Sequence, residues 1–442
     1  MKKRILALLT AAVLALGLLA ACGGSTPAST APPASTAPAA STGGEAGGDA
    51  ALEGDLELWV YEEFFKDGEN SAIATATQAF TDANPGVNIK ITPVPYGSSS
   101  YRDKYIQAAN GGGGPDMLQC DNIWVPQFAA MDIIIPLTGR MESLKGEFFQ
   151  GTIDAATWNN EIWGVPFAAD SMILFYNKDM FEAAGLDPEA PPTTWEEFRE
   201  YGLALKDNGM GAYGLLGGWG GSFEWLPWFW QNGGEIVDAD NKPTFNSPEG
   251  MEATKFFLNM LTTDGLVPEA ALTWKSWDEL AAGFANQTVA MCQGMAVLNL
   301  ALANLEVDFN WGVAVLPSRE KEANTLGGSH WVVNKNSENA DVAYAWIEFI
   351  SSKEQALSIS DSYLRISARN DAMEQKTVQA DPVVTVFVEA LETSRPRPII
   401  AEWTTIDYDC IQPAFMEVIF EGADIEEAMA KAETLADAAL SE

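Results

Sequence analysis

The chain of 442 residues contains a single histidine and four cysteines, which limits the chemistry it can perform. Because His330 stands alone and no CxxC pair occurs, a zinc site of histidine and cysteine ligands has no spacing to rest on. A Ser-His-Asp triad would have to use His330, and no GxSxG motif accompanies it. The GxxxxGK[ST] phosphate loop is also absent. We therefore expect neither a metal nor a cofactor.

Two remaining signals of catalysis are weak. GMGAYG (209–214) matches the GxGxxG pattern, but it follows a helix-like segment instead of opening a helix after a strand, as dinucleotide-binding folds require. Paired carboxylates could hydrolyse glycosidic bonds, yet nothing among 62 acidic residues singles out one pair. A glycan-active enzyme stays open as an alternative to a binding protein.

Basic residues are scarce as well: 25 lysines and arginines face 62 acidic residues, for a net charge of −37. Such a surface repels nucleic acid and anionic ligands at long range and suits a neutral or cationic ligand. An effect on solubility alone explains the charge equally well. We expect no nucleic-acid partner.

The first residues resemble a bacterial lipoprotein signal. Three basic residues precede an apolar stretch (5–19) that is too short to be a stable membrane span. It ends in LAAC at Cys22, which resembles a lipobox. The prediction is a signal peptide over 1–21 and a lipidated Cys22 that anchors the chain on the outer face of the bacterial cell membrane. An ordinary signal peptide with an incidental cysteine is the alternative.

Residues 22–51 are predicted to form a flexible tether, since 23–51 are almost wholly Gly, Ala, Ser, Thr and Pro. Its reach would be about 30 Å. Three cysteines then remain in the body, Cys120, Cys292 and Cys410, widely spaced. We predict buried free thiols; one disulfide plus a spare thiol is the alternative.

Strand-like and helix-like periods alternate through the body. LELWV (56–60) and VNIKITPV (87–94) read as strands on either side of a helix at 71–80. This rhythm predicts an α/β fold with a mainly parallel sheet. The roughly 390 residues after the tether favour two domains. Further helices are expected after the capping box Thr194 to Glu197, at 340–350, and from Asp424.

Several stretches, taken in order, resemble the family 1 extracellular solute-binding proteins of ABC importers, the maltose-binding-protein group. The resemblance covers about residues 52 to 440. The stretches are AFTDANPGVNIKITPV (79–94), GGGGPDML (111–118), WNNEIWGVPFAADSMILFYNKDMFEAAGL (158–186), PPTTWEEF (191–198), FANQTVAMCQGM (284–295), GVAVLPS (312–318), GGSHWVVNKNSENADVAYAWIEFISS (327–352) and RPRPIIAEW (395–403).

The resemblance implies a two-lobed periplasmic-binding-protein type II fold, in which discontinuous lobes are joined by a hinge and enclose a ligand cleft. Hinge crossings are expected near 166–170, 315–318 and 365–369. Lobe one would comprise 52–167 plus 317–366, and lobe two 168–316 plus 367–442.

Aromatic rings bury the apolar faces of sugars, while charged and amide groups bind the hydroxyls. On this basis, the resemblance implies ligand-binding roles for Tyr61, Glu62, Asp121, Asn122, Trp124, Asp170, Trp219, Phe223, Trp225, Arg369 and Trp403. For each acid the alternative is a solvated charge or helix cap, for Arg369 a structural ion pair, and for each ring the core. Core packing is expected of Trp228, Phe229 and Trp230, and a structural role of His330. The family often has an aromatic after the glycine of its AM..G strand, where this chain has Met295, which weakens any transfer of maltose specificity.

The resemblance implies a non-enzymatic, monomeric substrate-binding component of an ABC importer. It would capture a sugar or short oligosaccharide by closing its lobes and deliver it to permease subunits in the membrane. The same scaffold binding a non-sugar solute, such as a polyamine, is the alternative.

Overall fold

The computed structural model describes residues 51–95, 98–374 and 380–441, with the side chains of Ser98, Ser99 and Trp219 left out. The expected signal peptide, Cys22 and nearly all of the expected tether lie outside the described residues. No helix in the described ranges has both the length and the apolar character needed to cross a bilayer.

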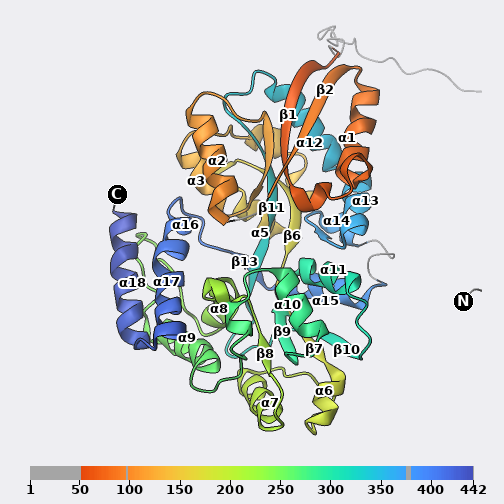
Figure 1. The fold of residues 1–442 in the computed structure, drawn as a ribbon. Coiled ribbons are helices and arrows are strands. Elements are labelled where there is room, and N and C mark those ends of the chain that lie inside the picture. The colour runs from red at the N-terminus through yellow and green to blue at the C-terminus, as the bar shows by residue number, and fades with distance from the viewer. Residues whose placement is uncertain (1–50, 96–97, 375–379, 442) are drawn as a thin grey trace, which may run out of the picture. The chain divides into compact units, whose positions relative to one another are not determined.

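Two larger sheets organise the described chain (Figure 1). The larger has seven strands, with β13 paired to β11 beside the order β12-β6-β11-β3-β1-β2: β1 (Glu53–Tyr61), β2 (Gly86–Val94), β3 (Met117–Asp121), β6 (Val165–Asp170), β11 (Asn324–Val333), β12 (Ile366–Ser367) and β13 (Ser394–Pro396). The smaller has the order β10-β7-β9-β8: β10 (Trp311–Val315), β7 (Ile173–Asn177), β9 (Met291–Gly294) and β8 (Tyr213–Gly214). A hairpin joins β4 (Thr157–Trp158) to β5 (Glu161–Ile162).

The expectation of a mainly parallel sheet is wrong, because both sheets are mixed. β1 pairs in parallel with β2 and β3, as the β-α-β rhythm predicts. β11, however, runs antiparallel to β3 and β6, and β7 runs antiparallel to β9 and β10. β7 follows β6, a strand of the larger sheet, almost directly, and β11 follows β10, a strand of the smaller sheet, after a short connection. Parallel neighbours require a long crossover connection, usually a helix, and neither β7 nor β11 is preceded by one.

Helices cover the larger sheet. These are α1 (Ala72–Ala83), α2 (Ser98–Asn110), α3 (Trp124–Ala130), α4 (Thr138–Met141), α5 (Gln150–Ala155), α12 (Ala340–Ile350), α13 (Lys353–Tyr363) and α14 (Asn370–Met373), with 3₁₀ turns η1 (Glu62–Phe65), η2 (Gly68–Asn70) and η3 (Lys145–Glu147). α1 begins where Ser71 accepts the Ala74 N–H, and it buries Ile73, Ala76 and Phe80 on one face. The helices expected near 71–80 and at 340–350 are thus confirmed.

Other helices surround the smaller sheet: α6 (Lys178–Ala183), α7 (Trp195–Asp207), α8 (Ser222–Gln231), α9 (Pro248–Leu261), α10 (Trp277–Ala285), α11 (Ala296–Asn304), α15 (Pro382–Glu392), α16 (Trp403–Thr405), α17 (Gln412–Met416) and α18 (Ile425–Leu440). Short turns η4 (Gly217–Trp219) and η5 (Ala271–Thr273) and π-helical segments η6 (Ile406–Ile411) and η7 (Glu417–Glu421) complete this part. The predicted capping box of Thr194 and Glu197 is confirmed at the start of α7, and Asp424 caps α18.

The chain changes sheets close to the expected crossings. β6 ends in the larger sheet at Asp170, and β7 begins in the smaller at Ile173; β10 ends at Val315, and β11 begins at Asn324. Three residues beyond 167 therefore still belong to the larger sheet. β12 pairs with β6, and α14 contacts β12 and α13, so residues 366–373 pack with the larger sheet. The lobe boundaries themselves stay a prediction.

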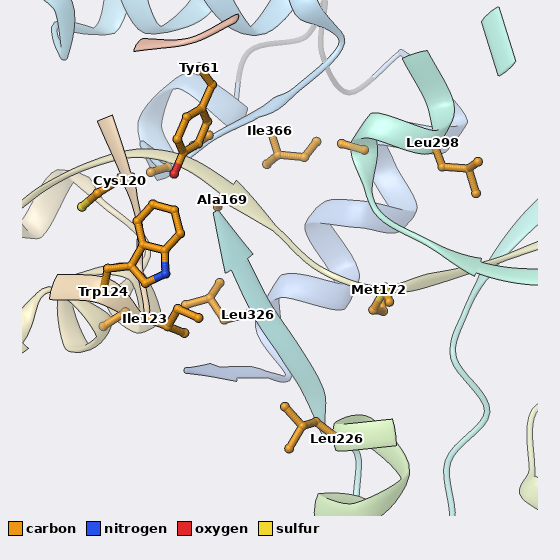
Figure 2. Close-up of a cluster of buried hydrophobic side chains, with 14 of the residues drawn as sticks. Tyr61, Cys120, Ile123, Trp124, Ala169, Met172, Leu226, Leu298, Leu326 and Ile366 are labelled. Atoms are coloured by element: carbon orange, nitrogen blue, oxygen red, sulfur yellow. The ribbon is translucent and has the colours of Figure 1, made fainter. Parts of the chain in front are cut away.

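Buried apolar side chains from the elements of both sheets belong to one hydrophobic core. In Figure 2, Tyr61 and Trp124 lie beside the upper end of β11, Leu326 lies near its middle, and Leu226 of α8 lies at its foot. The three cysteines in the described ranges, Cys120, Cys292 and Cys410, are buried and free, as predicted.

Candidate ligand-binding site

Arg397 joins three segments that are far apart in the sequence. It directly follows β13, which is held beside the start of β11. One of its terminal nitrogens, Nη2, donates to the carboxylate of Asp121 at 2.7 Å and to the amide oxygen of Asn122 at 2.6 Å, both at the end of β3. Its guanidinium carbon lies 5.1 Å from the centre of the Phe223 ring in α8, a cation–π distance. We call these four residues the Arg397 cluster.

The Arg397 cluster borders a small cavity at the junction of α3 and the segment after β13. Its walls include Asn122 and Arg397. The cavity measures about 10 Å³, enough for about one water molecule. A sugar ring could enter only if the elements around Arg397 moved apart.

The π-helical segment η6 adds Asp407 and Tyr408 to this region. Asp407 is buried, accepts a hydrogen bond from the Gln412 amide at 3.3 Å, and is also bonded by Ser222. Burial raises the pKa of Asp407 to about 6, although Ser222 and nearby Arg397 oppose the shift. The guanidinium of Arg102, in α2, lies 5.9 Å from the Tyr408 ring. Because π-helical turns are rare and concentrate at functional sites, η6 supports a ligand-facing role.

Asp170 forms a second group of contacts, in which the end of β6 is joined to the start of α11 and to Arg365. It accepts hydrogen bonds from Arg365 at 3.0 Å and from the backbone N–H of Ala296, the first residue of α11, at 3.0 Å. Arg365 also binds Glu63 at 2.7 Å. Burial raises the pKa of Asp170, while the arginine and the N–H group oppose this shift. The carboxylate of Asp170 therefore holds α11 against the last residue of β6.

The side chains of Met295 and Asp170 both lie against the backbone of Gly327. A Cβ atom added at Gly327 would lie 3.2 Å from the sulfur of Met295, 3.2 Å from Asp170 and 3.5 Å from Phe223. Met295, which stands where the family often has an aromatic residue, thus packs beside Asp170 and Phe223.

A further cavity of about 50 Å³ is lined by Glu63, Arg365 and residues of α11, with space for a few water molecules.

Tyr61 ends β1, and Trp124 begins α3 two residues after Asn122. Both are buried, and the ring of Tyr101 contacts them at centroid distances of 5.3 and 5.8 Å. The side chain of Gln119 accepts the N–H of Tyr61. In Figure 2 the hydroxyl end of Tyr61 points toward Trp124. A direct role of these rings in binding stays a prediction.

Three predicted site residues lie elsewhere. Trp225 is fully buried among Phe229 and Phe415, with its indole N–H donated to Thr254, so its ligand-facing role is wrong: the helix packs this ring into the core. Trp228, Phe229 and Trp230 are core residues, as predicted.

Arg369 is a structural residue, since its guanidinium binds Asp371 at 2.9 Å, Glu147, and the Ser351 carbonyl. This is the ion pair that was the alternative to ligand binding. Glu62 is exposed on η1 and lies outside both groups of contacts.

Trp403 is buried in α16, and its indole N–H has no hydrogen-bond partner among the described residues. His330 lies in the interior, where its Nε2 is 2.8 Å from the Thr152 carbonyl. Burial lowers the pKa of His330 to about 4, so the ring is neutral, as a structural histidine would be. The side chain of Trp219 lies outside the described part.

Sequence reasoning missed Arg397, Arg365 and Asp407. Arg397 stands in the RPRPIIAEW stretch, whose resemblance marked the segment but not the residue. No local pattern marks Asp407, because its position depends on the π-helical turn. Within the described residues, no group of three or more His, Cys, Asp or Glu side chains could hold a metal ion.

The chain matches the family of bacterial extracellular solute-binding proteins over residues 66–357. It belongs to this family. A binding protein of Brucella abortus is 25% identical over 370 residues, covering 81% of this chain and 88% of that protein. The sn-glycerol-3-phosphate-binding periplasmic protein of Escherichia coli K12 is 26% identical, covering 64% and 68%.

Solved structures show the two-lobed fold. A solute-binding protein of Thermotoga lettingae bound to α-D-tagatose superimposes with a TM-score of 0.77 at 24% identity, covering 87% of this chain and 99% of that one. The maltose-bound MalE3 of Thermotoga maritima gives 0.75 at 24% identity, covering 86% and 98%. The solute-binding protein is therefore the α/β, two-lobed component that captures solute for an ABC importer.

Proposed function

We propose that this solute-binding protein captures a sugar or short oligosaccharide between its two lobes. The observation that carries the proposal is the Arg397 cluster, in which a carboxylate, an amide, a guanidinium and an aromatic ring from three distant segments meet at the end of β3. Hydroxyl groups bind such charged and amide groups, and an aromatic face covers a sugar's apolar C–H surface.

The structural neighbours support this ligand class, since two of them hold tagatose and maltose. The glycerol phosphate of the E. coli relative fits the site less well. A phosphate requires positive charge, yet Arg397 already binds Asp121 and Arg365 already binds Asp170. A ligand without negative charge avoids this conflict.

Binding would shift the equilibrium between open and closed arrangements of the lobes, because one ligand contacts both at once. The closed form, a monomer, would then dock on permease subunits. We further propose that lipid on Cys22 holds the protein on the outer face of the cell membrane, and that it binds its ligand without altering it.

A thermal-shift screen of the full chain tests the function, using mono- and oligosaccharides, amino acids, glycerol phosphate and polyamines. A ligand that binds only the native state stabilises it by about 2.7 kcal/mol at a hundredfold excess over Kd. We expect a shift with one class of sugar, lost in Phe223→Ala. A shift with polyamines or amino acids alone would contradict the sugar assignment. Breakdown of the sugar by the purified protein would favour the enzyme alternative.

A further inference from the structure

Four carboxylates in the described residues are buried, and they differ in their partners. Asp121 and Asp170 each bind an arginine, at 2.7 and 3.0 Å. Asp407 and Glu224 are buried as deeply, with 5% and 2% of their surface exposed, yet neither forms an ion pair with a described residue. A buried charge without a direct counter-charge is costly, so a positive group bound from outside the chain would stabilise the α8 and η6 side of the site.

Asp407 is the member of this pair that faces the Arg397 cluster. Its described hydrogen-bond partners are the neutral side chains of Gln412 and Ser222. Arg397 is near enough to lower the pKa of Asp407, but its Nη2 donates to Asp121. With a pKa of about 6, Asp407 is mostly ionised at pH 7.5. Its charge is thus available to a cation from outside the chain.

Trp403 provides a second observation, on the same helical run as Asp407. Its side chain is 1% exposed, and its indole N–H has no partner among the described residues. Trp403 and Asp407 are four residues apart in the continuous helical run of α16 and η6, so they share a face. A buried N–H group without an acceptor is destabilising, so this donor requires an oxygen.

Building on the proposed function, we infer that the bound solute is an amino sugar whose protonated amine binds the carboxylate of Asp407. The indole N–H of Trp403 donates to a hydroxyl or ring oxygen of the same ligand, and Phe223 covers the ring. A polyamine shares the ammonium group but offers no oxygen to Trp403.

The test compares matched ligands by isothermal titration calorimetry with the full chain at pH 7.5. The β-1,4-linked dimers of glucosamine, N-acetylglucosamine and glucose share one ring skeleton, and only the first carries amines that protonate near neutral pH. A charge-assisted hydrogen bond predicts that the glucosamine dimer binds about tenfold or more tightly than the other two. Spermidine, as a cation without a sugar ring, completes the series and is expected to bind weakly.

Variants then locate the amine. Asp407→Asn keeps the shape of the side chain and removes the charge, and it should reduce the affinity for the glucosamine dimer more than that for the glucose dimer. Asp409→Asn is the matched control, because Asp409 is exposed on the same segment. Trp403→Phe should weaken both sugars and leave spermidine unchanged. The comparison of ligands on the unaltered chain needs no variant to fold.

The outcomes separate the two proposals. Equal affinity for the glucosamine and glucose dimers would overturn the inference and leave sugar binding intact. Binding of spermidine alone, abolished by Asp407→Asn, would support the ammonium site and overturn the sugar assignment. If neither the glucosamine dimer nor spermidine binds, the inference is wrong. Binding of the neutral glucose dimer would then still support the proposed function.

Discussion

Arg397 donates to Asp121 over 2.7 Å and thereby ties the segment after β13 to the end of β3. The two side chains are 8% and 10% exposed, so water screens the pair little. Their separation of 276 residues means that the contact exists only once the chain has crossed between its sheets. The bond therefore contributes to the native arrangement as well as to the proposed site.

Asp121→Asn should lower the free energy of unfolding by about 3–5 kcal/mol, because it leaves a buried guanidinium without its counter-charge. Urea denaturation of the full chain measures this loss. Replacing both partners with apolar residues, as in Asp121→Leu with Arg397→Met, should cost less than the sum of the single changes. Additive losses would show that the two charges do not interact in solution.

Trp225 and Phe223 are two residues apart in the sequence and should respond differently to truncation. Trp225→Ala removes a fully buried ring and should cost about 3–5 kcal/mol of stability, with ligand affinity retained at temperatures where the variant is folded. Phe223→Ala, at a half-buried ring beside Arg397, should cost less stability and most of the binding. The same binding loss in both variants would contradict the placement of Trp225 in the core.

Local patterns predicted the elements of this fold well. α1, α7 and α18 carry side-chain caps, and α12 has a clear apolar face, so each is defined by residues within one or two turns of it. The antiparallel pairing of β7 and β11 was not predicted. The direction of a strand depends on where the chain crosses between sheets, and no local sequence pattern indicates this.

The candidate site was only partly predictable for the same reason. Asp121, Asn122 and Phe223 stand at element ends and could be named, whereas Arg397 and Asp407 acquire their neighbours through contacts across long separations. α8 is apolar on nearly every side, so its sequence gives no periodicity that separates Trp225 from a ligand-facing ring.

Glu224 makes stability depend on pH. Burial raises its pKa from 4.5 to about 7, so the folded chain binds more protons than the unfolded chain between these values. Its contribution is therefore fully present below pH 4.5 and is lost as the pH rises through 7. Glu224→Gln, compared with the unaltered chain by denaturation at several pH values, should remove this decline. An unchanged decline would assign it to other groups, among them Asp407.

Substitution of Cys22 tests the proposed lipid anchor. If lipid is attached to this residue, Cys22→Ala should move the protein from the membrane fraction of the cell to the soluble fraction or the medium, without a change in ligand affinity of the purified protein. A protein that fractionates with membranes equally well after the change would contradict lipid attachment at Cys22. Cys410→Ala is a suitable control, because that thiol is buried and free.

Gly328 is required by the backbone of β11. Its φ is +113°, in a region that other residues rarely adopt, and a Cβ atom would lie 2.1 Å from the carbonyl oxygen of Ala168. Gly328→Ala should therefore destabilise the fold by more than about 1 kcal/mol, because either β6 or β11 must move. Gly139→Ala is the matched control: it adds the same methyl group in α4, where nothing lies within 4 Å, and should stabilise slightly. Since β6 ends at Asp170, which holds α11, the Gly328 variant should also weaken ligand binding. Retained stability in urea would show that β6 and β11 are further apart in solution.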